Sequence, residues 1–176
     1  MAHVWLRLVD EHDADFILSL RTDVEKNRYM SLVDNDLKLQ RKWLSEYKLR
    51  ENDKKEYYFI IESSDMGALG TVRVYDFAGS SFSWGSWVLK SGAPRYAAIE
   101  SALAVYEFSF GFLKLERSCF EVRKGNERVI EFHKRSGARV SGEDDMNVYF
   151  NYELKDYAKF KARYNKFFQS PFFRDV

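Results

Sequence analysis

The 176-residue sequence has little of several things, and each shortage excludes a class of protein. Cys119 is the only cysteine, so no disulfide can form within the chain. It lies in "ERSCFEVR", which alternates like a strand. This pattern favours a buried structural thiol over a nucleophile, because reactive thiols need exposed, electropositive surroundings. His3, His12 and His133 are too far apart to suggest paired metal ligands, and no metal site is predicted.

Net charge and long apolar runs are also scarce. The formal net charge is +1, so no overall field favours nucleic acid or an anionic membrane. No apolar run approaches the roughly 18 residues of a membrane span, and "MAHVWLRLVDEHDADF" does not resemble a secretory signal. No G-x-S-x-G elbow, Walker loop or intact G-x-G-x-x-G motif occurs. We therefore expect a soluble, cytoplasmic protein.

The residues that are present predict one domain over residues 1–176. Apolar residues make up 45% of the chain, enough for a substantial core, and no linker or repeat divides it. Periodicity predicts strands at 3–10, 55–63, 68–77, 81–90, 115–124 and 147–155, and helices at 11–21, 35–52, 97–112 and 126–137. This order predicts an α/β (α+β) fold, with a mixed central sheet and helices on both faces.

The tail, residues 154–176, is basic and aromatic. Rings and lysines together are found in proteins that bind single-stranded nucleic acid. We favour instead an amphipathic helix whose Tyr157, Phe160 and Tyr164 pack on the body or on a second subunit. Phe172 and Phe173 are compatible with a homodimer and equally with capping of the core. No nucleic-acid partner is predicted.

Two segments can carry chemistry. In "VLKSGAPRYAAIESAL" a strand ends, a small-residue turn follows and a helix begins, which suits a phosphate group. In "RKGNERVIEFHKRSGA" the helix between Asn126 and Gly137 carries His133 on the same face as Val129 and Ile130. An imidazole there is either a proton carrier or a partly buried, hydrogen-bonded side chain. Neither segment is specific alone.

In combination, the segments resemble the Gcn5-related N-acetyltransferase (GNAT) superfamily, within it the Rim-like branch. The resemblance is strongest in "ESALAVYEFSFGFLKLERSCFEVRKGNERVIEFHKRSGA", which is similar to the family pattern at Glu100, Phe110, Leu113, Arg117, Val122, Asn126 and Gly137. It implies a splayed, mostly antiparallel sheet, acetyl-CoA as cosubstrate, and direct transfer of an acetyl group to an amine. It covers most of the chain and leaves only the tail outside.

The resemblance also implies a cofactor site. The strand residues Trp87, Val88 and Leu89 would meet the pantetheine arm. The loop residues Gly92, Ala93, Pro94, Arg95, Tyr96 and Ala97 would hold the pyrophosphate, with Asn126 and Val129 beside the cofactor. The loop departs from the family pattern, since Ser91 stands at a Gln/Arg position and Pro94 and Tyr96 stand where small residues are usual.

The catalytic residues implied are His133 and Asn126. His133 stands where the family commonly has a tyrosine, and its imidazolium would return a proton to the CoA thiolate. Asn126 would cap the helix and reach the ligands. The position of a frequent glutamate base is Ser83, which is no base, so a water chain to Glu62, Asp76 or His133 is left open.

The acceptor is expected to be a small molecule carrying a primary amine. Tyr75, Phe77 and Trp84 are predicted to bind it, since rings stack on sugars and nucleobases, although core packing explains them equally. "GTVRVYDF…SFSWGSWVL" is similar to small acetyltransferases that modify nucleotide-linked amino sugars for surface polysaccharides. A peptide or protein N-terminal acetyltransferase is one alternative. A non-catalytic acyl-CoA-binding or interaction module is the other.

Overall fold

One mixed sheet runs through the protein. The structure is a computed structural model that describes residues 4–164 and 172–174. Its strands follow the order β6-β7-β5-β4-β3-β2-β1-β8. Only β4–β5 and β1–β8 pair in parallel. The strands are β1 Val4–Leu8, β2 Tyr57–Ser63, β3 Gly67–Ala78, β4 Ser81–Leu89, β5 Arg117–Arg123, β6 Arg139–Glu143, β7 Asn147–Glu153 and β8 Phe173–Arg174.

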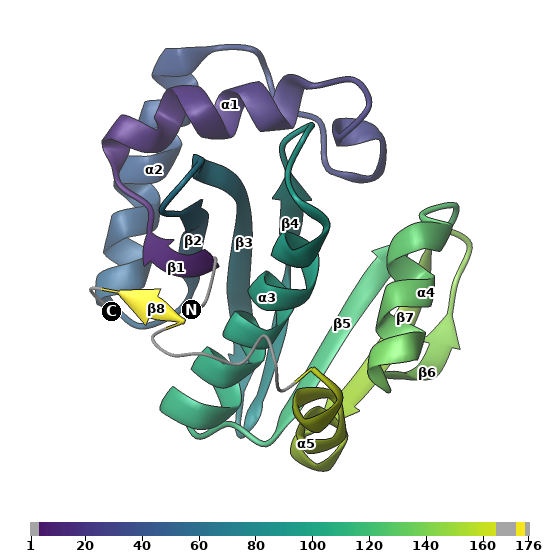
Figure 1. Ribbon diagram of the computed structural model, residues 1–176. Helices are drawn as coiled ribbons and strands as arrows, with labels where there is room; N and C mark the ends of the chain where they lie inside the picture. The colour runs from purple at the N-terminus through teal and green to yellow at the C-terminus, as the bar shows by residue number, and fades with distance from the viewer. Residues whose placement is uncertain (1–3, 165–171, 175–176) are drawn as a thin grey trace.

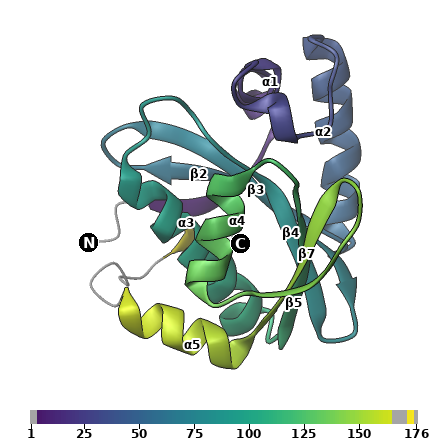
Figure 2. The ribbon, with the colours of Figure 1, turned by 90° about the vertical axis from the view of Figure 1, so that its right-hand side faces the viewer.

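Helices cover both faces of this sheet (Figures 1 and 2). On what we call the first face lie α1 Ala14–Thr22, preceded by the short turn η1 Glu11–Asp13, and α2 Leu37–Asn52, with η2 Asn27–Tyr29 between them. Asp36 caps α2 through its carboxylate. On the second face lie α3 Arg95–Tyr106, α4 Glu127–Ser136 and α5 Leu154–Arg163. The helix α3 continues into a π-helical turn, η3 Glu107–Phe112.

Each face has its own hydrophobic core. On the first face, Ile17, Leu44 and Tyr47 of the helices pack on Tyr58 and Ile60 of β2. The larger core, on the second face, joins α3, η3, α4 and α5 to inward residues of the strands. Because β2 alternates, its residues contribute to both cores, and the sheet is buried on both sides at this strand.

The sheet is incomplete in its middle. The parallel strands β4 and β5 pair only at Ser81↔Arg117 and Phe82↔Ser118, then diverge (Figure 1). Along the diverging part, β4 carries a bulge against β3, since Thr71 pairs with Val88 but Arg73 pairs with Gly85. Ser86 takes a left-handed backbone, φ 48°, and neither it nor Trp87 is in register with a residue of β3 or β5, although the Ser86 carbonyl accepts from the Thr71 hydroxyl at 3.1 Å. The backbone of β4 at Trp87 is therefore available to a ligand in the gap.

The mixed fold with helices on both faces is confirmed, and so are the predicted helices and strands to within a few residues. Two strands were missed. The charged turn before β7 is strand β6, all of whose residues are exposed, and β8 in the tail adds to β1. Because β6 has no buried face, no alternation of apolar residues marks it.

The prediction of a buried Cys119 is wrong, because its side chain is exposed. Strand β5 buries the opposite set of alternating residues, Ser118, Phe120 and Val122. In the tail, Tyr157 and Phe160 are buried and Phe172 caps the core, so these rings are not free to stack on bases. The basic and aromatic stretch 165–171 lies outside the described residues.

Candidate active site

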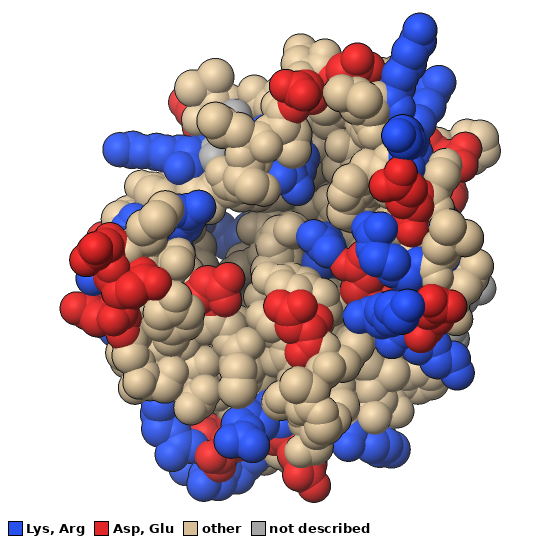
Figure 3. All heavy atoms as spheres, turned by 180° about the vertical axis from the view of Figure 1, so that it is seen from behind, with Lys and Arg blue, Asp and Glu red and all other residues tan. Residues whose placement is uncertain are grey.

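A cavity of about 380 Å³ occupies the gap where β4 and β5 diverge, and we call it the splay cavity. Trp84–Val88 of β4 and Phe120–Arg123 of β5 form its walls, with α4 on the second face and residues 29–31 on the first. Figure 3, the view from behind, shows a deep hollow near the middle of that surface with Lys and Arg atoms around its rim. The cavity therefore reaches both faces of the sheet.

His133 forms the wall of the splay cavity on the second face. Its side chain is 3% exposed and lies among rings, with centroids 4.5 Å away for Phe120 and 5.3 Å for Trp84. Its Nδ1 is buried and has no hydrogen-bond partner in the part of the chain described. Burial lowers the pKa of His133 to about 3, because the cation would lose its hydration.

This burial corrects one part of the sequence prediction. Burial favours the neutral imidazole over the imidazolium that the resemblance implies for His133. A neutral ring still carries one N–H donor and one acceptor nitrogen. At the splay cavity it is suited to donate a hydrogen bond to a sulfur or oxygen of the ligand.

The start of α3 opens a second hollow beside the first. This loop hollow, of about 540 Å³, is lined by Trp87–Arg95 on one side and by Asn126, Arg128 and Val129 of α4 on the other. It shares Trp87, Val88, Asn126 and Val129 with the splay cavity, so the two are continuous. The cations Lys26, Lys90, Arg95 and Arg128 outnumber the one anion in its lining, Glu25. This excess suits a ligand with several phosphates.

The atypical loop is less disrupted than its sequence indicates. Pro94 stands at the N-cap, before the first helical residue, so its missing N–H removes no donor from α3 itself. Tyr96 packs against the core of the second face and Ala97 is fully buried. These two predicted cofactor contacts are therefore absent from the loop hollow, and the bulk of Tyr96 does not obstruct it. No side chain caps the start of α3.

Asn126 departs from its predicted capping role. It stands at the N-cap of α4, but its side chain makes no capping hydrogen bond, while its carbonyl accepts from the N–H groups of Val129 and Ile130. Its side chain lines both the splay cavity and the loop hollow. The amide is thus placed between the two sites, where a ligand that spans them would pass.

Of the three aromatic residues predicted for the acceptor, the structure brings two to the splay cavity. Tyr75 lies on the first face, its hydroxyl over Gly85, where an added Cβ would stand 2.8 Å from that oxygen. Trp84 lines the second face and donates from Nε1 to the Tyr106 hydroxyl at 3.2 Å.

The prediction for Phe77 is wrong. A register shift follows Tyr75, and Asp76 takes a left-handed backbone, φ 52°. This bulge turns Phe77 to the second face, where it contacts Tyr57 and the core.

Glu121, which was not among the residues predicted from the sequence, lines the splay cavity from the first face. Alternation along β5 places it opposite Phe120 and Val122, and its charge contributes to raising the pKa of Tyr75, after burial as the main cause. Glu121 is exposed, like Cys119 on the same side of β5. The divergence of β4 from β5 places it at the cavity, and no local sequence pattern reveals that divergence.

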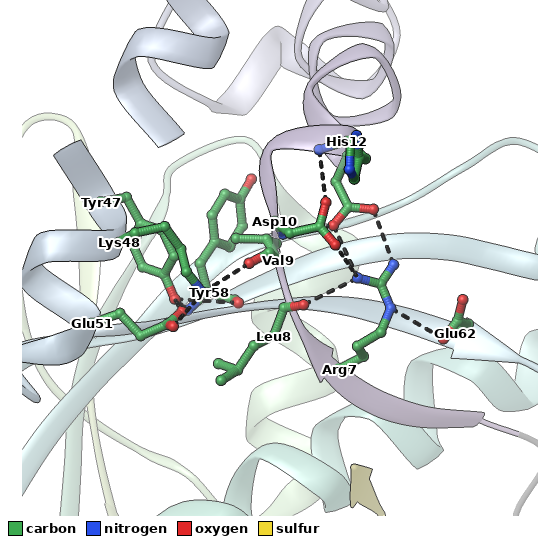
Figure 4. A network of polar contacts seen from close by, with 11 residues as sticks. Arg7, Leu8, Val9, Asp10, His12, Tyr47, Lys48, Glu51, Tyr58 and Glu62 are labelled. Carbon is green, nitrogen blue, oxygen red and sulfur yellow. Dashed lines mark hydrogen bonds and ion pairs between the residues drawn. The ribbon is translucent and has the colours of Figure 1, made fainter. Parts of the chain in front are cut away.

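The other candidate bases are less well placed. Glu62 pairs with Arg7, which also binds Asp13, on the far side of β2 (Figure 4). Asp76 is exposed at the β3 bulge, and neither carboxylate lines the splay cavity. Ser83 is buried and interacts with the Tyr75 hydroxyl. Glu121 is the carboxylate in the cavity lining.

Metal-binding clusters and membrane-spanning helices are both absent from the described residues. No group of three or more His, Cys, Asp and Glu side chains there is placed to hold a metal ion. Among the helices of that same part of the chain, none has both the length and the apolar character needed to cross a membrane.

A sheet that splays between two parallel strands, with a phosphate-suited loop and helix start at the opening, defines an acyl-CoA-dependent transferase. The profile of the "Acetyltransferase (GNAT) domain" family matches residues 3–139. The chain belongs to this family, and it is therefore an acetyltransferase that uses acetyl-CoA. A search of curated proteins found no significant match.

Solved structures agree with this assignment. One described as apo FdhC, a nucleotide-linked sugar GNAT, is 46% identical, with 96% of each chain covered and a TM-score of 0.88. Spermidine N-acetyltransferase from Vibrio cholerae, in complex with CoA and spermine, is 15% identical over 90% of this chain and 99% of its own, with a TM-score of 0.76. A dodecameric form of the same enzyme is 18% identical over 89% and 97%, with a TM-score of 0.70. These last two share the fold.

Proposed function

We propose that the protein transfers the acetyl group of acetyl-CoA to the primary amine of a nucleotide-linked amino sugar. The observation that carries the proposal is the splay cavity, with Glu121 on one side of the sheet and His133 on the other. Residues 29–31 form part of its wall on the first face, and its volume of about 380 Å³ favours a small acceptor over an extended peptide. The 46% identity to a nucleotide-linked sugar GNAT supports the same acceptor class.

The donor side of the reaction belongs to the loop hollow. Acetyl-CoA supplies the acetyl group as a thioester. Arg95 and Arg128 are placed to bind its phosphates, and the backbone at Trp87, beside the bulge of β4, is placed to pair with its amide-bearing arm. The Asn126 side chain lies on the path between the loop hollow and the splay cavity.

On the acceptor side, Glu121 is the group we assign to proton removal. At neutral pH an amine is mostly an ammonium ion, which cannot attack the thioester. A carboxylate must therefore take a proton from it. The nitrogen–carbon bond then forms as the carbon–sulfur bond breaks, CoA leaves as a thiolate, and the proton that the nitrogen loses on becoming an amide is taken up by that sulfur. No covalent bond to the chain is needed. His133 stabilises the leaving sulfur through an N–H hydrogen bond.

The two rival functions make different demands on this site. A peptide or protein N-terminal acetyltransferase needs a groove for several residues of extended chain, and the splay cavity of about 380 Å³ argues against it. A non-catalytic acyl-CoA binder needs no carboxylate in the cavity, and the position of Glu121 argues against that. A homodimer and a cytoplasmic location stay predictions from the sequence.

The test is an acetylation assay with UDP-, TDP- and GDP-linked amino sugars, beside a calorimetric titration with acetyl-CoA. We expect micromolar binding of acetyl-CoA, about −8 kcal/mol, and turnover of at least one sugar. Glu121→Gln should lower kcat by roughly 10²- to 10⁴-fold without changing acetyl-CoA affinity. Glu131→Gln, an exposed glutamate of α4 paired with Lys134, is the matched control and should retain full turnover.

Two results would contradict the proposal. Turnover of peptide N-termini but of no nucleotide-linked sugar would assign the acceptor to the rival class. Unchanged kcat in Glu121→Gln would remove this residue from proton transfer while leaving the acceptor class intact.

A further inference from the structure

A second cavity adjoins the splay cavity on the first face of the sheet. It measures about 600 Å³ and lies between α1, α2 and residues 31–34, over β2 and β3. We call it the arginine cavity, because Arg21 and Arg73 are in its lining. Ser31 and Arg73 line both this cavity and the splay cavity. A ligand that fills one can therefore extend into the other.

Two arginines of the arginine cavity, Arg21 and Arg73, each have a buried Nε without a partner among the described residues. The hydroxyl of Tyr58 is buried beside them and interacts with Arg21 and Thr71. Tyr58 itself is only 1% exposed. Buried donors without acceptors are rare in folded proteins, because each has given up its water. Their convergence on one cavity indicates a ligand that accepts hydrogen bonds.

The charges around the cavity favour an anion. Glu56 is buried and pairs with both Arg50 and Arg73, so one carboxylate serves two guanidinium groups there. Arg21 adds a third cation. Its guanidinium donates to the carbonyl and hydroxyl oxygens of Ser31, both at 2.9 Å, and these oxygens carry no charge. The acidic residue in the cavity lining is Asp34, which is exposed. The guanidinium geometry matches the paired oxygens of a phosphate.

The two arginines are held before any ligand arrives. The Arg73 guanidinium lies over the rings of Trp43 and Tyr75, at 5.3 Å and 5.2 Å, and is bound by Glu56. Arg21 is fixed by Ser31. Because their positions are set by these contacts, little side-chain entropy is lost on binding. Ile17 and Leu39 add apolar wall beside them, which suits a nucleoside.

We propose that Arg21, Arg73 and Tyr58 bind the diphosphate of the nucleotide-linked acceptor, with the nucleoside in the arginine cavity. This rests on the proposed function. In a nucleotide-linked sugar the diphosphate is joined directly to the sugar ring, so its site must adjoin the cavity that holds the amine. The shared wall at Arg73 provides that continuity, and places the sugar in the splay cavity near Glu121.

The test measures binding of UDP, TDP and GDP by calorimetry, with acetyl-CoA present, and the KM for the turned-over sugar. We expect one diphosphate to bind. Arg21→Gln should weaken it and raise KM by about 10-fold or more. Tyr58→Phe, which removes the buried hydroxyl and retains the ring, should weaken it about 5-fold.

The control is Arg41→Gln on α2, an exposed arginine paired with Asp15 at 3.7 Å, which should change neither value. Acetyl-CoA affinity should stay constant in every variant, because the loop hollow is separate from these residues. If the wild type acetylates a nucleotide-linked sugar but Arg21→Gln and Tyr58→Phe retain its KM, the subsite is wrong and the proposed function stands. If no nucleotide-linked sugar is acetylated and no diphosphate binds, both fail.

Discussion

His133 shows how burial decides the chemistry of a residue. The imidazole of His133 lies among the rings of Trp84, Phe120 and Phe150, and these apolar surroundings favour its neutral form over the cation. A group in this state is a fixed dipole at physiological pH. Its hydrogen bonding to the ligand is then constant across the pH range in which ordinary histidines titrate.

The stability of the protein should therefore fall in mild acid. The unfolded chain takes a proton on His133 below about pH 6.5, whereas the folded chain takes it only near pH 3. Stability from this residue is present above pH 6.5 and is lost as the pH falls toward 3, by roughly 4 kcal/mol. Urea unfolding across this range should show the slope in the wild type and a flatter one in His133→Phe.

The exposed His12 provides the control, because His12→Gln removes a histidine from the surface and should leave the slope unchanged. An equally steep slope in His133→Phe would show that other groups cause the acid sensitivity. We also expect the dependence of kcat on pH to show no ionisation of His133 between pH 5 and 8.

At the scale of elements, the close approach of β3 and β4 depends on Gly70. A Cβ there would stand 2.1 Å from the Val88 carbonyl oxygen, a backbone atom that cannot move without separating the strands. Gly70→Ala should lower the free energy of unfolding by about 3 kcal/mol. It should also weaken acetyl-CoA binding, since Val88 lines both the splay cavity and the loop hollow.

Gly142→Ala in β6 is the matched substitution, because an added Cβ meets no atom within 4 Å. Chemical denaturation of the two variants should separate them clearly. Similar stabilities would mean that β3 and β4 adjust to the added methyl group.

Elements with one buried face were predictable from the sequence, and those without one were not. The alternation of β5 and the stripe of α2 follow from packing against a core, but β6 has no buried residue to mark it. The candidate site divides in the same way. His133, Asn126 and the loop were found through the family pattern. Phe77 was misplaced by the bulge at Asp76, and Glu121 faces a gap that only the three-dimensional splay creates.

At the scale of the whole molecule, the C-terminal segment closes the fold against its first strand. Strand β8 pairs with β1, and the Leu6 N–H donates to the Phe172 carbonyl at 2.7 Å. The ring of Phe172 is 2% exposed, so Phe172→Ala should lower the free energy of unfolding by about 3–5 kcal/mol.

Phe112, half exposed at the end of η3, is the comparison, and Phe112→Ala should cost about 1 kcal/mol or less. Thermal unfolding of both variants measures the difference. Equal losses would mean that the last residues add little to the core.

The parting of β4 from β5 also bears on how the protein avoids aggregation. Unpaired strand edges ordinarily lie at the rim of a sheet, where another chain can add to them. Here two such edges face each other inside the molecule, between α4 on one face and residues 29–31 on the other. A slender, amide-bearing ligand can enter between them, whereas a foreign β-strand with its side chains cannot. The fold thus retains open hydrogen-bonding capacity without presenting it to its neighbours.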